Sequence, residues 1–413
     1  MNNAGLPVHV SKLRTGTLTR AREEARDCVF SYQEGIRDEF AVSLTMPIQP
    51  DPYVWERGMH PVFDMNMPEG HLRLALISMF RKAVKGFDAF QLLNVIGPYQ
   101  LGRVTAGQSS APPMPETSVR DLLLHDGAQD LFDDLLSTYA AYSGVSGVQP
   151  KVLVRDETGG DIERLTHKGA THIVKSWQAN EFPQLATNEY FCLRAAKHAG
   201  INVAKFDLSA GGRFLVVERF DVSETGYLGF EDFCVLNGMV TDEKYDSSYE
   251  ACARMVKAYL PQHKIAHALR ELFINIALSA AIQNGDAHLK NFGLLYDHAG
   301  ADADIDLAPA FDLITTTAYK QRDIMALSLA GSKNWPKHKL LYQFGRIACG
   351  LTDSQVTLAL EQVADGISKA AVELREHIEH NEQFKVIGER MLAAWDWGTM
   401  RCLADDKRPR TNA

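Results

Sequence analysis

The sequence predicts an α+β fold in at least two lobes, with a β-rich part followed by a helical part. Its 413 residues exceed what one hydrophobic core usually serves, and a hydrophobic content of 46% can fill more than one core. Strand-like runs predominate up to about residue 222, whereas apolar residues recur at helical spacing beyond about residue 230. A proline-rich stretch at residues 109–118 is typical of a linker. We therefore predict domains at residues 1–115, 116–230 and 231–413.

Five runs before residue 222 have the composition of strands, because apolar, β-branched and aromatic residues gather in them between turn residues. They are residues 28–32, 40–48, 148–154, 171–177 and 213–221. Two helices are expected among them. One covers residues 67–80, with Pro68 in its first turn, and the other covers residues 187–200, opened by Thr187 and closed by Gly200.

Helices make up most of the last part of the chain. Residues 263–283 place their apolar side chains along one stripe, which is typical of a helix packed on a core. A capping box formed by Thr352 and Gln355 opens another helix, and helices continue to Trp395. Three short segments interrupt them, namely strands at residues 291–297 and 304–309 and a solvated loop at residues 246–250.

Composition excludes several functional classes. The net charge of −9 argues against binding nucleic acid as a polyelectrolyte, and the short basic stretch at residues 407–410 is expected to be a solvated end. No apolar run approaches the roughly 20 residues of a membrane span, and the first residues lack the apolar core of a signal peptide, so we expect a cytoplasmic protein without membrane contact. The six cysteines contain no CxxC pair, which argues against a disulfide framework or a zinc site.

The stretch NGDAHLKN at residues 284–291 carries the strongest chemical signal. Asp286 and Asn291 are five residues apart, the separation of the catalytic-loop aspartate and asparagine in protein kinases. Such a carboxylate accepts the proton of the phosphoryl acceptor, while the amide oxygen holds a magnesium ion. A second carboxylate should follow, and Asp312 is the candidate for the principal magnesium ligand. A simple turn would explain Asn284, Gly285 and Asp286 but not the other polar residues.

Two further residues of this stretch are candidates for catalysis. His288 is about as suited to orienting the loop by a hydrogen bond as to acting as an acid or base, and it is a poor metal ligand beside hard oxygen donors. Lys290 could place a cation against the γ-phosphate or could be an ordinary surface lysine, and we favour the first role.

The β-rich part offers a second half of a nucleotide site. Gly144 and Gly147 lie three residues apart before a strand, so backbone N–H groups there could face phosphates, although a hairpin turn would show the same pattern. The chain has no Walker A box, which argues against a P-loop NTPase. Lys175 ends the next strand and suits the kinase lysine that grips the α- and β-phosphates, with Glu189 as a plausible helix partner.

With these residues identified, the chain resembles the HipA family of serine/threonine kinase toxins from bacterial HipA–HipB toxin–antitoxin pairs. The resemblance covers nearly the whole chain and implies a two-lobed, protein-kinase-like fold. That fold has a β-rich N-lobe with an additional N-terminal subdomain and an all-helical C-lobe. The segments that carry the resemblance are residues 61–73, 88–104, 146–151, 216–221, 231–234, 284–291 and 307–312.

The resemblance also implies roles for particular residues. Asp286 would be the catalytic base, Asn291 and Asp312 the Mg²⁺ ligands, and Lys175 the phosphate-binding lysine of the ATP site. The hinge that holds adenine would include Glu218 and Phe220. The loop over the phosphates would include Gly147, Val148, Gln149 and Lys151.

Regulation and partners follow from the same resemblance. HipA-like kinases autophosphorylate a serine of the phosphate loop, and Ser146 and Ser143 are both available here, whereas Gly144 stands where some members carry a serine. An added phosphate would deny ATP its place beside the loop. The expected substrate is a translation protein, an aminoacyl-tRNA synthetase in the family's studied cases. The expected partner is a HipB-like helix-turn-helix antitoxin that contacts DNA, so that this chain reaches DNA only indirectly.

Two other functions remain open at this point. A small-molecule phosphotransferase could share the catalytic loop and the metal aspartate, since the sequence does not reveal the acceptor pocket. A weakly active corepressor scaffold is the non-enzymatic alternative, but Asp286, Asn291, Asp312 and Lys175 are all present. We favour the kinase because the motifs converge.

Overall fold

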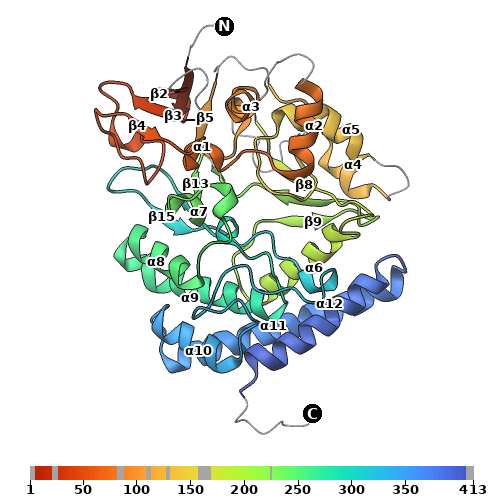
Figure 1. The fold of residues 1–413 in the computed structure, drawn as a ribbon. Coiled ribbons are helices and arrows are strands. Elements are labelled where there is room, and N and C mark those ends of the chain that lie inside the picture. Colours follow the sequence, from red (N-terminus) through yellow and green to blue (C-terminus); the bar gives the residue numbers. More distant parts are fainter. Residues whose placement is uncertain are drawn as a thin grey trace. The chain divides into compact units, whose positions relative to one another are not determined.

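The computed structural model describes residues 5–20, 27–80, 88–107, 113–126, 131–156, 169–223 and 226–405 (Figure 1). The chain forms two compact units. Unit 1 comprises Met1–Trp177, Phe206–Asp242 and Gly293–Ile305, and unit 2 comprises Gln178–Lys205, Glu243–Phe292 and Asp306–Ala413. Strands predominate in the first unit and helices in the second, which confirms the predicted α+β class. The basic stretch at residues 407–410 lies outside the described residues.

The first sheet of unit 1 is antiparallel with the strand order β4-β3-β2-β1-β5. Its strands are β1 (Leu6–Val10), β2 (Leu13–Arg20), β3 (Cys28–Tyr32), β4 (Tyr53–Trp55) and β5 (Val104–Ala106). One face packs on helices α1 (Pro61–Asp64), α2 (Gly70–Phe80) and α3 (Ala89–Ile96) through buried Val8, Leu18, Phe30, Leu72 and Leu93. The sequence analysis missed β1 and β2, although the buried residues Leu6, Val8 and Val10 alternate along β1.

The strand predicted at residues 40–48 is wrong. This segment contains the end of a 3-10 helix and one isolated bridge, from Ser43 to Met46. Two of its backbone N–H groups bond to side chains instead of a neighbouring strand, because Val42 N donates to the Tyr32 hydroxyl and Leu44 N donates to Glu231. Local composition could not reveal these partners, since Glu231 lies far away in the sequence.

The second sheet of unit 1 has the strand order β6-β7-β8-β10-β9. Its strands are β6 (Glu116–Thr117), β7 (Lys151–Asp156), β8 (His172–Lys175), β9 (Phe206–Leu208) and β10 (Leu215–Glu218). The helices α4 (Val119–Leu124) and α5 (Phe132–Tyr139) contribute to the same core, which contains Val152, Val154, Val174 and Phe214. Three predicted strands are therefore confirmed with shorter bounds. Of the predicted linker, residues 109–112 lie outside the described part, and β6 occupies its end.

Two smaller sheets complete the strand content. A hairpin pairs β11 (Val222–Ser223) with β12 (Gly226–Tyr227). A three-stranded sheet has the order β13-β14-β15, with β13 (Gly229–Asp232) antiparallel to β14 (Gly293–Tyr296), and β15 (Ile305–Leu307) beside β14. The short helix α7 (Phe233–Leu236) follows β13, capped by the side chain of Asp232. Both strands predicted between residues 291 and 309 are confirmed.

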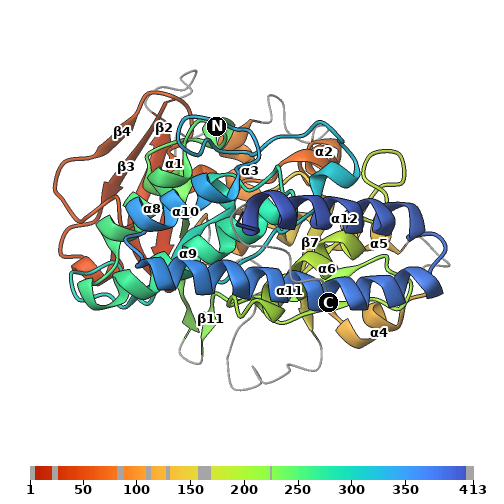
Figure 2. The same ribbon diagram turned by 90° about the horizontal axis from the view of Figure 1, so that it is seen from below.

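Within the described residues, unit 2 contains six α-helices. They are α6 (Leu185–His198), α8 (Tyr249–Tyr259), α9 (Gln262–Ala281), α10 (His338–Ile347), α11 (Asp353–His380) and α12 (Lys385–Gly398). The apolar helix α9 packs against four of the others, α8, α10, α11 and α12. Figure 2 shows α11 and α12 as two long neighbouring helices. The predicted capping box of Thr352 and Gln355 is confirmed at the start of α11. A π-helical turn, Thr399–Leu403, follows α12.

The solvated loop predicted at residues 246–250 is wrong at its end. The helix α8 begins at Tyr249, which is completely buried, and the Ser248 side chain accepts a hydrogen bond from Ala251 N as its cap. Charged neighbours concealed this start in the sequence, although a serine before an apolar residue is a usual cap signal.

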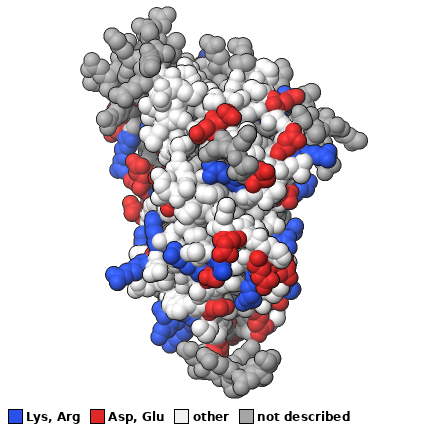
Figure 3. All heavy atoms as spheres, turned by 90° about the vertical axis from the view of Figure 1, so that its right-hand side faces the viewer, with Lys and Arg blue, Asp and Glu red and all other residues white. Residues whose placement is uncertain are grey.

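The surface agrees with the composition. On the face drawn in Figure 3, acidic and basic side chains are interspersed. Within the described part of the chain, no helix is both long and apolar enough to cross a bilayer.

Candidate active site

The predicted catalytic stretch begins where α9 ends. Gln283 adopts a left-handed backbone with a φ of 56°, and Asn284 N still donates to Ser279 O at 2.8 Å. Gly285 follows with no room for a side chain, because a Cβ there would lie 2.2 Å from Asp323 Oδ2. The end of a buried helix therefore delivers Asp286 at a fixed point of unit 2.

The stretch is held by its own hydrogen bonds. Asp286 N donates to Asn284 Oδ1 at 3.1 Å, His288 N donates to Asp286 O at 2.8 Å, and Asn291 Nδ2 donates to Asp286 O at 2.7 Å. The last bond fixes the orientation of the Asn291 amide. Within the described residues, the amide oxygen of Asn291 accepts no hydrogen bond, so it is available to a cation.

A threonine connects this stretch to the segment that carries Asp312. Thr316 Oγ1 accepts a hydrogen bond from Gly285 N at 2.9 Å and donates to Gln283 O at 3.1 Å. The neighbouring residue Thr315 is held by the side chain of Asn188 in α6. Thr315 N donates to Asn188 Oδ1 at 2.8 Å, and Asn188 Nδ2 donates to Thr315 O at 3.1 Å. Hydrogen bonds within unit 2 therefore connect the two segments that are predicted to bind the metal.

Asp312 has an unusual backbone. Its φ is 52°, in the left-handed region that L residues other than asparagine and aspartate rarely adopt. Just before it, Ala310 N donates to Asn202 O at 2.8 Å, and Ala310 forms a bridge with Val203. The left-handed residue turns the chain directly after this bridge. Backbone strain at a candidate functional residue is the expected pattern when the surroundings enforce it.

His288 lies at the centre of the predicted catalytic residues. Burial lowers its pKa, the charges of Asp286 and Asp312 oppose that effect, and those of Lys244 and Lys290 reinforce it. The imidazole is therefore neutral near pH 7. Its Nε2 lies 3.9 Å from Asp286 Oδ1, beyond hydrogen-bond distance, and its Nδ1 is buried without a partner in the described residues. This geometry suits shaping the loop better than moving a proton.

Asp286 is more accessible than its neighbours. Its side chain is 43% exposed, whereas His288, Lys290 and Asn291 are all buried. The hydroxyl of Tyr245 donates to Asp286 Oδ1 at 2.6 Å. The sequence analysis did not single out Tyr245, because nothing local distinguishes it from a surface tyrosine.

The donor set fits a hard cation such as Mg²⁺, which prefers a few carboxylate and carbonyl oxygens and keeps several waters. Asn291 offers an amide oxygen whose orientation is fixed by its bond to Asp286 O, and Asp312 offers a carboxylate. Among the described residues there is no group of three or more His, Cys, Asp or Glu side chains that could hold a metal ion.

The predicted phosphate loop lies in unit 1, between α5 and β7. Gly147 has a φ of 113°, and a Cβ there would lie 2.3 Å from Lys151 Nζ. Only glycine allows both the backbone angle and this close approach of an ammonium group. The loop therefore lies directly against a buried cation.

Lys151 and Lys175 pair directly across the antiparallel strands β7 and β8. Directly opposite residues of an antiparallel pair point to the same face of the sheet, so the two lysine side chains lie on one face. Both are almost completely buried. This face of the sheet therefore carries two buried lysine side chains, and the ammonium group of Lys151 lies against Gly147 of the loop.

Glu69, the residue before α2, holds the loop by hydrogen bonds. Its Oε1 accepts hydrogen bonds from Ser146 Oγ at 2.8 Å and from Gly147 N at 3.1 Å. The following residue, Gly70, has a φ of 47°, and a Cβ on it would lie 2.6 Å from Val148 O. The sequence analysis missed Glu69, and only the fold brings it beside the loop.

The two candidate serines have different surroundings. Ser143 is completely buried, and its hydroxyl donates to Tyr139 O at 2.7 Å and accepts from Leu153 N at 2.8 Å. Ser146 is only partly buried and makes the bond to Glu69. Of the other loop residues, Val148 is 58% exposed, and Gln149 Nε2 donates to Ser176 O at 3.3 Å, which joins the loop to the end of β8.

The predicted hinge begins at the last residue of β10. Glu218 ends this strand, and the ring of Phe220 packs against Phe230 with centroids 5.7 Å apart. Between them lies an ion pair that the sequence analysis missed, in which the buried Arg219 guanidinium contacts Asp221 at 2.9 and 2.6 Å. The pair stiffens the segment from which the candidate adenine contacts project.

Comparisons with known proteins agree over most of the chain. A family profile described as the HipA N-terminal domain matches residues 6–107, and one described as the HipA-like C-terminal domain matches residues 143–371. The serine/threonine-protein kinase toxin HipA of Shewanella oneidensis is 24% identical over 70% of this chain and 71% of its own length. The Y4dM protein of Sinorhizobium fredii is 28% identical over 74% and 76%.

A solved structure gives the same result for the fold. A chain of the complex of HipA, HipB and operator DNA from Shewanella oneidensis MR-1 superposes with a TM-score of 0.68. The match covers 95% of this chain and 97% of that one at 20% identity, which shows a shared fold.

Proposed function

Because this chain belongs to the HipA family, we propose that it is an ATP-dependent serine/threonine protein kinase and the toxin of a toxin–antitoxin pair. One observation carries the proposal. Thr316 joins the stretch of Asp286 and Asn291 to the segment of Asp312 by hydrogen bonds to Gly285 and Gln283. A general base and two oxygen ligands on one rigid frame are what phosphoryl transfer requires.

The residues of unit 2 take the following roles. Asp286 accepts the proton of the acceptor hydroxyl, since it is the exposed carboxylate of the stretch. Asn291 and Asp312 hold the magnesium ion, which when bound neutralises phosphate charge. Lys290 adds a buried positive charge beside them, and neutral His288 fills the space under the loop.

The residues of unit 1 bind ATP in this proposal. Lys151 and Lys175 attract the phosphates, and the backbone of Gly147 and Val148 lies over them. Gln149 keeps the loop attached to β8, and Glu218 with Phe220 contacts adenine. Electrostatic attraction and positioning account for most of the catalysis in this reaction class.

We propose Ser146 as the autophosphorylation site in preference to Ser143. The Ser143 hydroxyl is buried with both a donor and an acceptor role occupied, whereas Ser146 is partly exposed on the loop. A phosphate on Ser146 would face Glu69 Oε1, which now lies 2.8 Å from its hydroxyl. Repulsion between the two anions would push the loop out of its place and silence the kinase.

The partners in this proposal come from the family. A HipB-like helix-turn-helix antitoxin would bring the chain to DNA, and the chain itself would not read DNA, in keeping with its net charge of −9. The protein substrate would be a translation protein, with aminoacyl-tRNA synthetases as the first ones to test.

The direct test is intact-mass analysis and phosphopeptide mapping after incubation with Mg²⁺ and ATP, followed by addition of aminoacyl-tRNA synthetases. We expect phosphate on Ser146 in the parent and none in Asp286→Asn after the same short incubation. A matched control is Asp306→Asn, which removes an exposed carboxylate bonded to Lys264 and should leave the activity unchanged. ATP binding without any phosphoprotein would favour a small-molecule acceptor and contradict the proposal.

A further inference from the structure

The contact of Tyr245 with Asp286 is not explained by any of the roles above. The phenol hydroxyl donates to Oδ1 at 2.6 Å, a short bond to a charged acceptor. The other oxygen of Asp286 receives no hydrogen bond from the described residues, and His288 Nε2 remains 3.9 Å from Oδ1. The two carboxylate oxygens of Asp286 therefore differ: Oδ1 accepts a hydrogen bond from Tyr245, and Oδ2 accepts none from the described residues.

Tyr245 itself is held in place by its surroundings. Its carbonyl oxygen accepts from Lys333 Nζ at 3.0 Å, and the preceding carbonyl, of Lys244, accepts from Leu289 N at 3.2 Å. The ring meets His288 edge-on with centroids 5.0 Å apart, and Lys244 Nζ lies 5.6 Å from the ring centre. These contacts hold both the backbone and the ring of Tyr245, and two of them, from His288 and Leu289, come from the catalytic stretch itself. They argue against the alternative that Tyr245 is a mobile side chain that covers Asp286 until an incoming acceptor displaces it.

We propose that Tyr245 is a positioning residue for Asp286. It fixes the carboxylate through Oδ1, so that Oδ2 faces the acceptor. The inference rests on the proposed kinase function. In the reaction, the acceptor hydroxyl gives its proton to Oδ2, its oxygen forms a bond to the γ-phosphorus, and ADP leaves with the electron pair of the broken bond. An unfixed carboxylate would spend part of its time in orientations that cannot take this proton.

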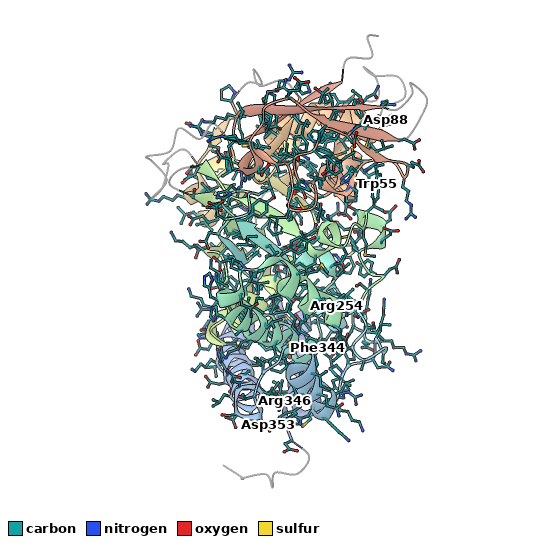
Figure 4. All side chains as sticks on the ribbon, turned by 90° about the vertical axis from the view of Figure 1, so that its left-hand side faces the viewer. Trp55, Asp88, Arg254, Phe344, Arg346 and Asp353 are labelled. Carbon is teal, nitrogen blue, oxygen red and sulfur yellow. The ribbon has the colours of Figure 1, made fainter. Side chains whose placement is uncertain are left out.

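The first test is Tyr245→Phe, which removes the hydroxyl but keeps the ring against His288. The matched control is Tyr342→Phe, because Tyr342 also donates to an aspartate oxygen, Asp353 Oδ1 at 2.9 Å, outside the site. Asp353 is labelled in Figure 4 next to Arg346, with which it forms an ion pair. The readouts are the rate of phosphoryl transfer at saturating ATP, the KM for ATP and the melting temperature.

We expect Tyr245→Phe to lower kcat by about ten- to a hundredfold, the worth of a hydrogen bond to a charged group. The KM for ATP should change less than about twofold, since the bond does not involve the nucleotide. Tyr342→Phe should leave both constants unchanged. A rate equal to or above that of the parent in Tyr245→Phe would overturn the inference.

A double-mutant cycle separates positioning from a structural role. If Tyr245 acts through Asp286, adding Tyr245→Phe to Asp286→Asn should cause no further loss of the residual transfer, followed by sensitive mass detection over long incubations. Equal losses in both backgrounds would overturn the inference while leaving the kinase proposal intact. A parent chain that transfers no phosphate would overturn both.

Discussion

At the residue scale, the catalytic stretch depends on contacts that no local pattern reveals. The Asp286 to Asn291 spacing predicted a kinase-like catalytic loop with a carboxylate base and an amide metal ligand, and the structure adds the Asn291 Nδ2 bond that fixes the amide. Thr316 and Tyr245 complete the site from segments that precede or follow the stretch by tens of residues. Sequence reasoning therefore named candidate catalytic and metal-binding residues, and it missed the residues that hold them in place.

Asn188 should be among the most sensitive positions outside the site. It is completely buried and bonds both backbone groups of Thr315. Asn188→Ala leaves a buried N–H and a buried C=O without partners, so we expect the free energy of unfolding to fall by about 2–4 kcal/mol. Chemical denaturation measures this change. Asn334→Ala, at an exposed side chain, should change it by less than about 0.5 kcal/mol, and an equally small effect at Asn188 would contradict the prediction.

At the element scale, the residues at the start of α2 hold the predicted phosphate loop in place by hydrogen bonds and a close contact. Glu69 accepts hydrogen bonds from Ser146 and Gly147, and Gly70 leaves no space between α2 and Val148. The glycine pair in the sequence predicted a loop that could bind anions. It could not predict that Glu69, more than 70 residues earlier in the sequence, already accepts hydrogen bonds from two donors of the loop.

Charge on Ser146 should therefore weaken ATP binding through Glu69. Ser146→Asp places a second carboxylate beside the first, which costs about 1–4 kcal/mol at this separation. We expect the Kd for ATP to rise about tenfold or more in nucleotide titrations. The double variant Ser146→Asp with Glu69→Gln should recover part of the affinity, because it removes one of the two charges. No recovery would mean that Glu69 is not the source of the repulsion.

A histidine cap gives α1 a pH dependence. His60 Nδ1 accepts from Val62 N at the helix start, and burial lowers the pKa of His60 to about 4. The folded state disfavours the charged imidazole, so stability is complete above the unfolded pKa of about 6.5 and is lost as the pH falls toward the folded value.

His60→Asn should reduce this loss. Asparagine can cap the helix but does not titrate, so we expect a smaller decrease in the free energy of unfolding between pH 6.5 and 4 than in the parent, by up to about 3 kcal/mol. Denaturation curves at several pH values would measure it. Parallel curves for the two proteins would contradict the assignment.

At the scale of the whole molecule, two buried carboxylates of unit 1 take hydrogen bonds from residues near the start of the chain. Glu231 of β13 accepts hydrogen bonds from Ser43 Oγ, Leu44 N and Tyr296 Oη, at 2.6, 2.8 and 2.6 Å. Asp221 accepts one from Gly102 N at 2.6 Å. Burial raises the pKa of Glu231, and its hydrogen bonds oppose the effect, so this carboxylate needs its partners Ser43 and Leu44.

A chain that begins at residue 113 should therefore fold poorly. In such a chain, buried Glu231 would keep only its hydrogen bond from Tyr296, and Asp221 would lose the one from Gly102. Removing the partners of a buried charge costs about 3–5 kcal/mol of stability. We expect such a chain to be insoluble, or soluble with an early thermal transition, when compared with the full chain by circular dichroism. An equally stable shortened chain would show that residues 113–413 fold without the N-terminal residues.

The sequence predicted the succession of strands and helices better than their connections. Apolar periodicity identified α9, a capping box identified α11, and β-prone composition identified the strands β7, β8 and β10, because each carries its signal within its own residues. The sequence did not reveal β1, β2 and the start of α8, where partners outside the segment contribute: β1 pairs with β2 and β5, and Tyr249 N donates to Ser328 O at 3.0 Å. The wrong strand at residues 40–48 has the same cause, since Glu231 and Tyr32 take the N–H groups that a strand would have used.

The burial of the cysteines has a practical consequence. All six thiols are buried and free, and burial raises the pKa of Cys28 to about 11 and that of Cys192, Cys349 and Cys402 to about 12. Thiolates are the reactive form, so the native chain should resist maleimide labelling while folded. A single cysteine placed at the exposed Val148 would then carry a fluorophore selectively, and its emission would follow the phosphate loop in real time as nucleotide is added.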